Sequence, residues 1–370
     1  MAIDLTGGLP DTREDVFADV PANPEMRDSV SMWISDDRGA IGLPRFAVEA
    51  YAPQWEAHGI QLNLALPDGR VYRLRETGKT HPALDEQGRP RIIGAGPLAF
   101  RCVEPFRLWT ADFRGTAVRL TTAGLLGGHH DGPRAEVEFH IEARPAVPPW
   151  IQGALLPDAA EKLTTGVEQG FMGGPRYEQL VRATGTVRVE GEEHAFTGSG
   201  LRIRRQGVRQ LAGFRGHCWQ SALFPDGRAF GYITYPPSPD GRPTYNEGFV
   251  FDGDGALVPA RVVRAPFLRA LRERGEDVTA VLETTDGRTV RVEAETVFSA
   301  HDTALRPTMP GFPVLHQSGV RYRWDGSETY GMMERSTVRG AVEWPDGVDA
   351  RLRDSAPEFS AGDYRPGNTP

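Results

Sequence analysis

The sequence predicts an all-β protein built from two antiparallel domains in tandem. Three observations favour this class: the chain is rich in Gly and Pro, Asp-Gly pairs recur between strand-like segments, and the helical signal is weak. Gly contributes 43 and Pro 30 of the 370 residues, well above average usage, while hydrophobic residues make up 39% and charged residues 25%. A folded chain with this composition places its excess Gly and Pro in many turns, which indicates short strands rather than long helices.

The Asp-Gly pairs mark the expected hairpins. Alternating segments flank them, as Gln61–Leu66 and Val71–Leu74 flank the first pair. Asp-Gly supplies the positive φ that both central residues of a type I′ turn need, so we expect type I′ turns at these positions. The pairs occur in both halves of the chain: Asp68-Gly69, Asp226-Gly227, Asp254-Gly255, Asp286-Gly287 and Asp346-Gly347.

Two short helices are expected. The first runs from Asp158 to Gln169, with Asp158 as the N-cap residue and Glu161 three residues later. The second runs from Pro266 to Arg274 and is stopped by Gly275. Neither is long enough to build a helical domain, so the expected fold is all-β with few short helices.

The length of the chain suits two domains better than one core. The best boundary is the Pro- and Gly-rich segment from Pro145 to Tyr177, after which strand alternation resumes. We expect two barrels or sandwiches, with polar, Pro/Gly-rich and loose ends to the chain. The four expected regions are an N-terminal segment at 1–30, a first barrel at 31–180, a second barrel at 181–360 and a flexible tail at 361–370.

Charge and cysteine content exclude several classes. The net charge of −8 argues against a nucleic-acid partner, because such binding needs a basic surface. Cys102 and Cys218 are too few and too far apart for a disulfide framework or a zinc knuckle. The sequence shows neither a signal-peptide pattern nor an apolar run long enough for a membrane span. We therefore expect a cytoplasmic protein with reduced thiols and no membrane span.

The densest run of chemically able side chains lies at Gly198–Arg209 and Gly216–Arg228. Together with nearby motifs, it resembles the two-domain lipocalin-like family that includes carotenoid hydratases, tocopherol cyclases, fungal Diels–Alderases and many bacterial members. The motifs that carry the resemblance are Tyr177-Glu178-Gln179, Gly185-x-Val187, Gly198-x-Gly200-x-Arg202, Trp219, Phe224-Pro225-Asp226-Gly227-Arg228 and Gly331-x-x-Glu334.

The resemblance implies two lipocalin-like antiparallel β-barrels in tandem, with an apolar ligand inside or between them. It also implies protonation, hydration, cyclisation or isomerisation of alkenes without a metal or redox cofactor. In such chemistry an acid delivers a proton and aromatic faces stabilise the carbocation. Many members carry Asp-His-x-Trp-Gly after Gly-x-Gly-x-Arg, whereas this chain has Ile203-Arg204-Arg205-Gln206-Gly207. This chain therefore uses other residues for catalysis or only binds its ligand.

Two pairs with one intervening residue are candidates for the site, since side chains on a strand repeat every second residue. His217 and Trp219 would supply an acid or base and an aromatic wall, and the alternative is a core Trp with His217 bonded to backbone. Glu247, in an apolar pocket with Tyr245 beside it, would have a raised pKa and donate a proton. The alternative for this second pair is an ordinary solvated strand edge.

Arg202 and Arg204 share one face of a strand, so they would hold a carboxylate or phosphate of the substrate, and the alternative is a salt-bridged or solvated face. Tyr232 is expected in the cavity wall. A metal site is not expected, because His129-His130-Asp131 lies in a Gly-rich loop without regular ligand spacing. The polar face of the strand Glu136–Glu142, which includes His140, is expected to be solvent-exposed.

The leading hypothesis is a cofactor-independent hydratase, cyclase or isomerase that acts by proton transfer on an apolar alkene-containing substrate. Glu247, His217 and Tyr245 are its expected catalytic residues, and Trp219, Tyr232, Arg202 and Arg204 are expected to bind substrate. A non-catalytic carrier of a hydrophobic small molecule is the first alternative. A structural or interaction protein that uses its sheet edges is the second.

Overall fold

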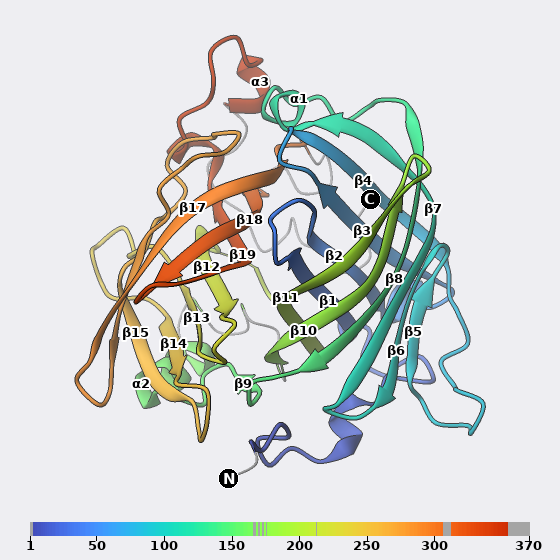
Figure 1. Ribbon diagram of the computed structural model, residues 1–370, viewed down its shortest axis with the longest axis horizontal. Helices are drawn as coiled ribbons and strands as arrows, with labels where there is room; N and C mark the ends of the chain where they lie inside the picture. The colour runs from blue at the N-terminus through green and yellow to red at the C-terminus, as the bar shows by residue number, and fades with distance from the viewer. Residues whose placement is uncertain are drawn as a thin grey trace.

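The computed structural model describes residues 3–165, 168, 171, 174, 176–211, 213–305 and 312–353. The chain forms two large antiparallel β structures that lie side by side (Figure 1). The strands of the first are β1 (Arg27–Asp36), β2 (Gly42–Tyr51), β3 (Ala57–Ala65), β4 (Arg70–Lys79), β5 (Ile92–Ala95), β6 (Leu98–Glu104), β7 (Leu108–Thr121), β8 (Arg134–Pro145), β9 (Trp150–Ile151), β10 (Arg176–Val189) and β11 (Glu192–Gly207).

The first sheet closes on itself because the long strand β7 has two partners on one edge. Its beginning pairs with β6, and its end, Val118–Thr121, pairs with Arg70–Arg73 of β4. The path β4-β3-β2-β1-β11-β10-β8-β7 thereby returns to β4, and we call these eight strands the first barrel. The short strands β5 and β6 extend from β7, and β9 pairs with β10.

The second barrel is a closed meander in chain order, in which each strand pairs with the next and β19 returns to β12. Its strands are β12 (Gly216–Leu223), β13 (Ala229–Thr234), β14 (Asn246–Phe251), β15 (Val258–Arg264), β16 (Ala280–Thr284), β17 (Thr289–Asp302), β18 (Val314–Trp324) and β19 (Ser327–Thr337). The expectation of an all-β chain with two antiparallel barrels is confirmed.

The passage from one barrel to the other lies later than the expected boundary near residue 180. β10 and β11 follow the Pro-rich segment, yet they complete the first barrel, since β11 pairs with β1 along Arg27–Asp36. The chain enters the second barrel only between Gly207 and Gly216. A local composition change marked the segment around α2 (Pro157–Thr164), whereas the β1–β11 pairing is set by residues far apart in sequence. The expected flexible tail at 361–370 lies outside the described residues.

The hairpin positions are confirmed, but the turn type differs from type I′. The Asp-Gly pairs at 68, 226 and 286 each join consecutive strands, and only their Gly residues have positive φ. In the first loop Gly69 donates to the carbonyl of Leu66, so Pro67 and Asp68 are the central residues of the turn. Pro favours type I geometry at its position, and Gly then takes the left-handed position after the turn. Asp346-Gly347 follows the last strand and joins no hairpin.

Helices are few and short. Those described are α1 (Thr122–Leu126), α2 (Pro157–Thr164), α3 (Ala350–Arg353) and the 3-10 turns η1 (Asp11–Glu14), η2 (Ala52–Gln54) and η4 (Arg339–Ala341). α2 matches the first expected helix, although Leu156 rather than Asp158 is its N-cap and the expected end at Gln169 lies outside the described residues. The second expected helix, Pro266–Arg274, is irregular chain, where Ala270 bridges Glu343.

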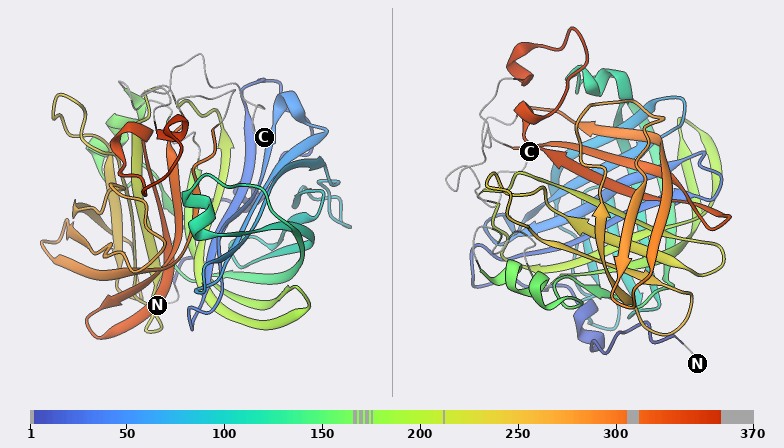
Figure 2. Two further views of the ribbon diagram at one scale, coloured as in Figure 1. Left: turned by 90° about the horizontal axis from the view of Figure 1, so that it is seen from above. Right: turned by 90° about the vertical axis from the view of Figure 1, so that its left-hand side faces the viewer.

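Three buried layers follow from these two barrels. Each barrel has an apolar interior, and a third cluster joins their facing sides, where β1 and β11 contact β19 and β11 contacts β12. Figure 2 shows the two barrels side by side with these strands between them. We call this third layer the inter-barrel face; its aromatic members include Trp33, Trp150, Phe171, Phe214, Trp219, Tyr235, Tyr245 and Phe249.

Candidate functional site

Most of the expected site residues lie on the side of the second barrel that faces the first. Trp219 of β12 lies opposite Glu334 of β19 on one side and opposite Ile233 of β13 on the other. Ile233 in turn lies opposite Glu247 of β14. Because directly opposed side chains project from the same side of a sheet, these residues form one row across four strands.

A second row runs beside the first and carries His217. His217 lies opposite Ser336 of β19, and the backbone of Tyr235 bonds to that of Tyr245 on the other side. The rings of Tyr235 and Tyr245 are in tilted contact, with their centroids 5.6 Å apart. The strand alternation predicted from sequence therefore does bring His217, Trp219, Tyr245 and Glu247 to one face.

His217 and Glu334 form a buried acid–base pair. Nε2 of His217 lies 3.3 Å from Oε1 of Glu334, and the two side chains retain 7% and 10% of their exposure. On the other side of the ring, Nδ1 lies 2.7 Å from Oγ of Ser336, which also accepts from the backbone N–H of His217 at 3.1 Å. Glu334 and Ser336 are two residues apart on β19, so they flank the same ring.

Glu334 carries its charge at neutral pH. Burial alone would raise its pKa, but the hydrogen bond from His217 and the charges of Arg45 and His217 outweigh burial and hold the pKa at about 2. Gln317 donates to Oε2 of Glu334 at 2.6 Å, and Asn63 of the first barrel donates to Gln317 at 2.7 Å. Both barrels thus fix the orientation of this carboxylate.

Arg45 reaches the inter-barrel face from a β-bulge. The register of β1 and β2 shifts between Met32 and Ile34, and Arg45 adopts a φ of 84°, a value that residues other than Gly rarely adopt. Its Nη2 lies 2.7 Å from Glu49, and its guanidinium lies 5.6 Å from the centre of the Trp33 ring. Backbone strain of this kind is common at functional sites, and it persists only where the surrounding packing holds it in place.

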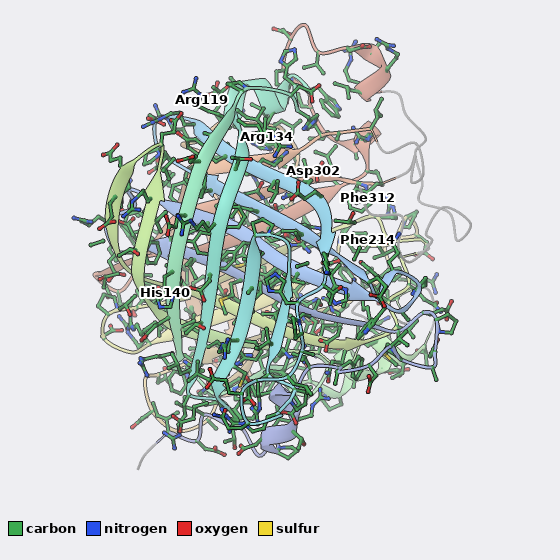
Figure 3. All side chains as sticks on the ribbon, turned by 90° about the vertical axis from the view of Figure 1, so that its right-hand side faces the viewer. Arg119, Arg134, His140, Phe214, Asp302 and Phe312 are labelled. Atoms are coloured by element: carbon green, nitrogen blue, oxygen red, sulfur yellow. The ribbon has the colours of Figure 1, made fainter. Side chains whose placement is uncertain are left out.

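Aromatic rings surround the His217–Glu334 pair. Phe214 lies 5.8 Å from the His217 ring, and Trp33 makes an edge contact with Trp219 at 4.9 Å. Phe312 is partly buried and packs against the same cluster, at the edge where Figure 3 labels it near Phe214. Unlike the fully enclosed core, His217, Phe214 and Tyr235 each keep about 6% exposure, so they border water-accessible space.

Glu247 is fully buried and surrounded by donors. Nε1 of Trp150 donates to it at 2.9 Å and the hydroxyl of Tyr245 at 3.0 Å. The backbone N–H groups of Gly153, Leu155 and Leu156 donate as well, at 2.6, 2.9 and 2.9 Å. Five donors already point at this carboxylate, and burial, followed by the charge of Glu247, raises the pKa of Tyr245 well above its ordinary value. This geometry suits an anchor for the segment before α2 rather than the expected proton donor.

Arg202 and Arg204 do share a face, but that face is the interior of the first barrel. Arg202 bonds to Glu14 of η1 at 2.7 Å, with both side chains fully buried, and Arg204 pairs with Asp28. Nε1 of Trp109 also donates to Glu14. The carboxylates that these arginines hold belong to the chain itself, so the salt-bridged alternative describes them. The N-terminal segment, expected to be loose, supplies Glu14 to this end of the barrel.

Tyr232 lies away from the other candidates. It is fully buried in the interior of the second barrel, with its hydroxyl 3.4 Å from Sγ of Cys218. The physical reason is strand alternation: Ile233, its neighbour, belongs to the inter-barrel row, so Tyr232 points to the opposite side of β13. Tyr232 therefore does not lie beside Trp219, where the expected role in the cavity wall would have placed it.

The outer face of the first barrel carries the exposed His140 that Figure 3 labels. His140 pairs with Asp112 at 2.6 Å, and both side chains are more than half exposed, as expected for this strand. Surface hollows of about 380 and 340 Å³ on this side share the charged residues Arg114, Glu138 and Arg188. Within the described ranges no three His, Cys, Asp or Glu side chains are arranged to hold a metal ion.

Residues 13–339 match the profile of DUF7064, a domain of unknown function. The chain belongs to the DUF7064 family. The match extends from η1 to η4 and includes both barrels, so the family is defined over the pair rather than over one barrel. Among curated proteins, none matches the sequence of this chain. None of the helices in the described part of the chain has the length and hydrophobicity that a membrane span requires.

Solved structures share the fold of this DUF7064 chain at low identity. An AttH candidate from Nitrosomonas europaea has 15% identity and a TM-score of 0.52, over 84% of this chain and 92% of that one. CghA in complex with Sch210972 has 10% identity and a TM-score of 0.51, over 89% and 96%. Kievitone hydratase from Nectria haematococca has 11% identity and a TM-score of 0.47, over 90% and 95%. The first two of these structures confirm the expected resemblance to the two-domain lipocalin-like proteins for the fold alone.

Sequence reasoning about this DUF7064 chain missed the roles of Arg45 and Ser336 and noted Glu334 only as part of a motif. The pairing of Glu334 with His217 joins residues more than a hundred positions apart, so spacing gives no signal for it. Pro44 before Arg45 did offer one, because Pro inside a strand pattern often marks a bulge.

Proposed function

We propose that this chain is an enzyme that transfers protons to an apolar, alkene-containing substrate held at the inter-barrel face. The substrate class would be a terpenoid, polyketide, steroid or aromatic alkene, and the reaction a hydration, cyclisation or double-bond isomerisation. None of these reactions changes the overall oxidation state of the substrate, so none consumes a redox cofactor. The observation that carries the proposal is the buried His217–Glu334 pair among aromatic rings.

In the proposed mechanism His217 acts as an imidazolium whose Nε2–H donates to Oε1 of Glu334. Nδ1–H then donates to Oγ of Ser336, which already accepts from the backbone of His217. The Ser336 hydroxyl proton is thereby free to pass to a substrate carbon, while Oγ takes the proton from Nδ1. The resulting carbocation would be stabilised by the faces of Trp219 and Phe214 and resolved by water addition, ring closure or loss of a neighbouring proton. The proton released in this last step passes to Oγ of Ser336 while the Ser336 proton returns to Nδ1 of His217, which restores the starting state.

The carrier alternative needs only an apolar lining. A charged carboxylate held beside an imidazole by residues of both barrels adds nothing to the binding of an apolar ligand. Its presence supports catalysis over transport.

The test starts with native mass spectrometry of protein from its own organism and extraction of any bound molecule. The extracted compound, or a terpenoid and steroid panel if nothing co-purifies, is then incubated with the protein in D₂O. Deuterium uptake at carbon is read by mass spectrometry. His217→Ala and Glu334→Gln should each lower uptake by about 10²-fold or more. His140→Ala, which breaks an exposed His–carboxylate pair, should leave it unchanged.

Uptake that survives in both inter-barrel variants would contradict the assigned residues. A bound compound that takes up no deuterium in the wild type would favour the carrier.

A further inference from the structure

Arg205 is the unpaired member of a row of charged residues on the first barrel. It lies opposite Arg176 of β10 and opposite Ser29 of β1, and Ser29 lies opposite Glu49 of β2. Opposed residues project from one side of a sheet, and Ile203, two residues before Arg205, belongs to the inter-barrel cluster. Arg205 therefore points toward the second barrel, away from Arg204 and the barrel interior.

The nearby carboxylates are already engaged by other groups. Arg176 lies 2.5 Å from Glu178, which also accepts from Nε1 of Trp219 at 3.1 Å. Glu49 accepts from Arg45 at 2.7 Å and from the Tyr51 hydroxyl at 2.6 Å.

Arg205 itself has no such partner in the described part of the chain. It makes no salt bridge there, and its Nε has no hydrogen-bond partner, although only 7% of the residue is exposed. Burial, followed by the charges of Arg27, Arg176 and Arg209, lowers its pKa well below the ordinary value, and the attraction of Glu49 does not offset this. A buried guanidinium that no carboxylate of the described chain bonds is unfavourable unless a ligand compensates it.

The cluster lies within reach of the proposed reaction centre. The guanidinium of Arg176 lies 5.0 Å from the centre of the Trp219 ring, and that ring lies 6.5 Å from the ring of His217. The charge of Arg205 also acts on the phenol of Tyr235, whose strand position adjoins His217. Arg176 and Trp219 thus connect the row that contains Arg205 to the ring of His217.

We propose that Arg205 anchors an anion subsite, so that the substrate is an apolar molecule with a carboxylate or similar acidic group. This rests on the proposed function, whose substrate class it narrows. The guanidinium binds the anion through paired N–H donors, while the aromatic rings hold the apolar part. The anion fixes which carbon of the substrate meets His217 and Ser336.

The test uses two fluorescent probes with one aromatic frame: anilinonaphthalene sulfonate, an anion, and phenylnaphthylamine, which is neutral. Each is titrated into the full chain as wild type, Arg205→Met and the control Arg188→Met, which changes an exposed arginine of the first barrel. The wild type should bind one sulfonate per chain, on the order of tenfold more tightly than the neutral probe. Arg205→Met should lose this preference and keep its affinity for the neutral probe, and Arg188→Met should match the wild type.

Thermal unfolding without ligand gives an independent reading. Arg205→Met removes an uncompensated charge, so its Tm should equal or exceed that of the wild type, and the sulfonate should raise Tm only in chains with Arg205. A clear fall in Tm for Arg205→Met, or unchanged preference for the sulfonate, would overturn the anion subsite and leave the proposed function standing. Failure of the wild type to bind either probe would overturn both. Full displacement of the sulfonate by equimolar inorganic phosphate would show that the site binds the anion alone. It would overturn the proposal that the ligand has an apolar part.

Discussion

The interior of the first barrel and the inter-barrel face use the same strand in opposite ways. Arg202 and Arg205 both belong to β11, and both are buried. Arg202 points inward to Glu14 and packs 4.9 Å from the Trp109 ring, whereas Arg205 points outward among other arginines. The difference teaches that burial alone does not separate a structural arginine from a functional one, because what decides is whether the chain supplies the counter-charge.

The largest expected effect comes from breaking the complete pair. Glu14→Gln keeps the shape of the side chain but leaves Arg202 as an uncompensated buried charge. We expect the free energy of unfolding to fall by about 3–5 kcal/mol, measured by urea denaturation. Glu136→Gln, at an exposed position of the same barrel, should stay within about 0.5 kcal/mol of the wild type. Equal effects from both variants would show that the stability of the first barrel does not depend on the Glu14–Arg202 pair.

The next effect concerns the charge of Glu334. Its pKa in the folded chain is about 2, below the ordinary value of 4.5, so its stabilising contribution is complete above pH 4.5 and is lost as the pH falls toward 2. The shift corresponds to about 3 kcal/mol at neutral pH. Unfolding of the wild type and Glu334→Gln, measured across this pH range, should converge toward the acid end. A stability difference that stays constant with pH would contradict the assigned charge.

A smaller effect on the free energy of unfolding is expected for Glu247, which lies on the same face as the His217–Glu334 pair but has a different role. Glu247→Gln places an amide donor among five donors, so we expect a loss of about 1–3 kcal/mol. Hydrogen exchange should accelerate at the amides of Gly153, Leu155 and Leu156. Deuterium uptake by the substrate, adjusted for the folded fraction, should stay near the wild-type value. A loss of uptake as large as that of His217→Ala, in a folded protein, would return Glu247 to the reaction.

Much of the fold could be predicted because its signals are local. Asp-Gly pairs located the hairpins, and alternation along β12 placed His217 and Trp219 on one side. The turn type was wrong because Pro67 and Pro225 shift the turn by one residue, an effect that the Asp-Gly pair alone does not show. The second expected helix failed because an apolar pattern over nine residues does not outweigh tertiary contacts such as the Ala270–Glu343 bridge.

The site could be predicted only in part, because partners decide it. Alternation shows that Arg202 and Arg204 share a face, but not that Glu14, 188 positions before Arg202, lies inside the barrel and pairs with Arg202. The same limit applies to Glu247, whose donors come from the segment before α2. Arg205 lies beside Arg202 and Arg204 in the sequence. Only the position of β11 between the two barrels shows that Arg205 projects toward the second barrel, whereas the other two project into the first.

The pairing of β1 with β11 also constrains the order of events during synthesis. Arg27 has its strand partner at Gly207, so the ribosome must release more than half of the chain before the first barrel can close. Until then β1 presents an unpaired edge, which is prone to associate with other chains. The second barrel also closes only when its last strand pairs with its first, but that pairing, Gly216 with Thr337, spans fewer residues. We therefore expect translation arrest before β11 to leave an aggregation-prone nascent chain, and arrest after it to leave a protease-resistant first barrel.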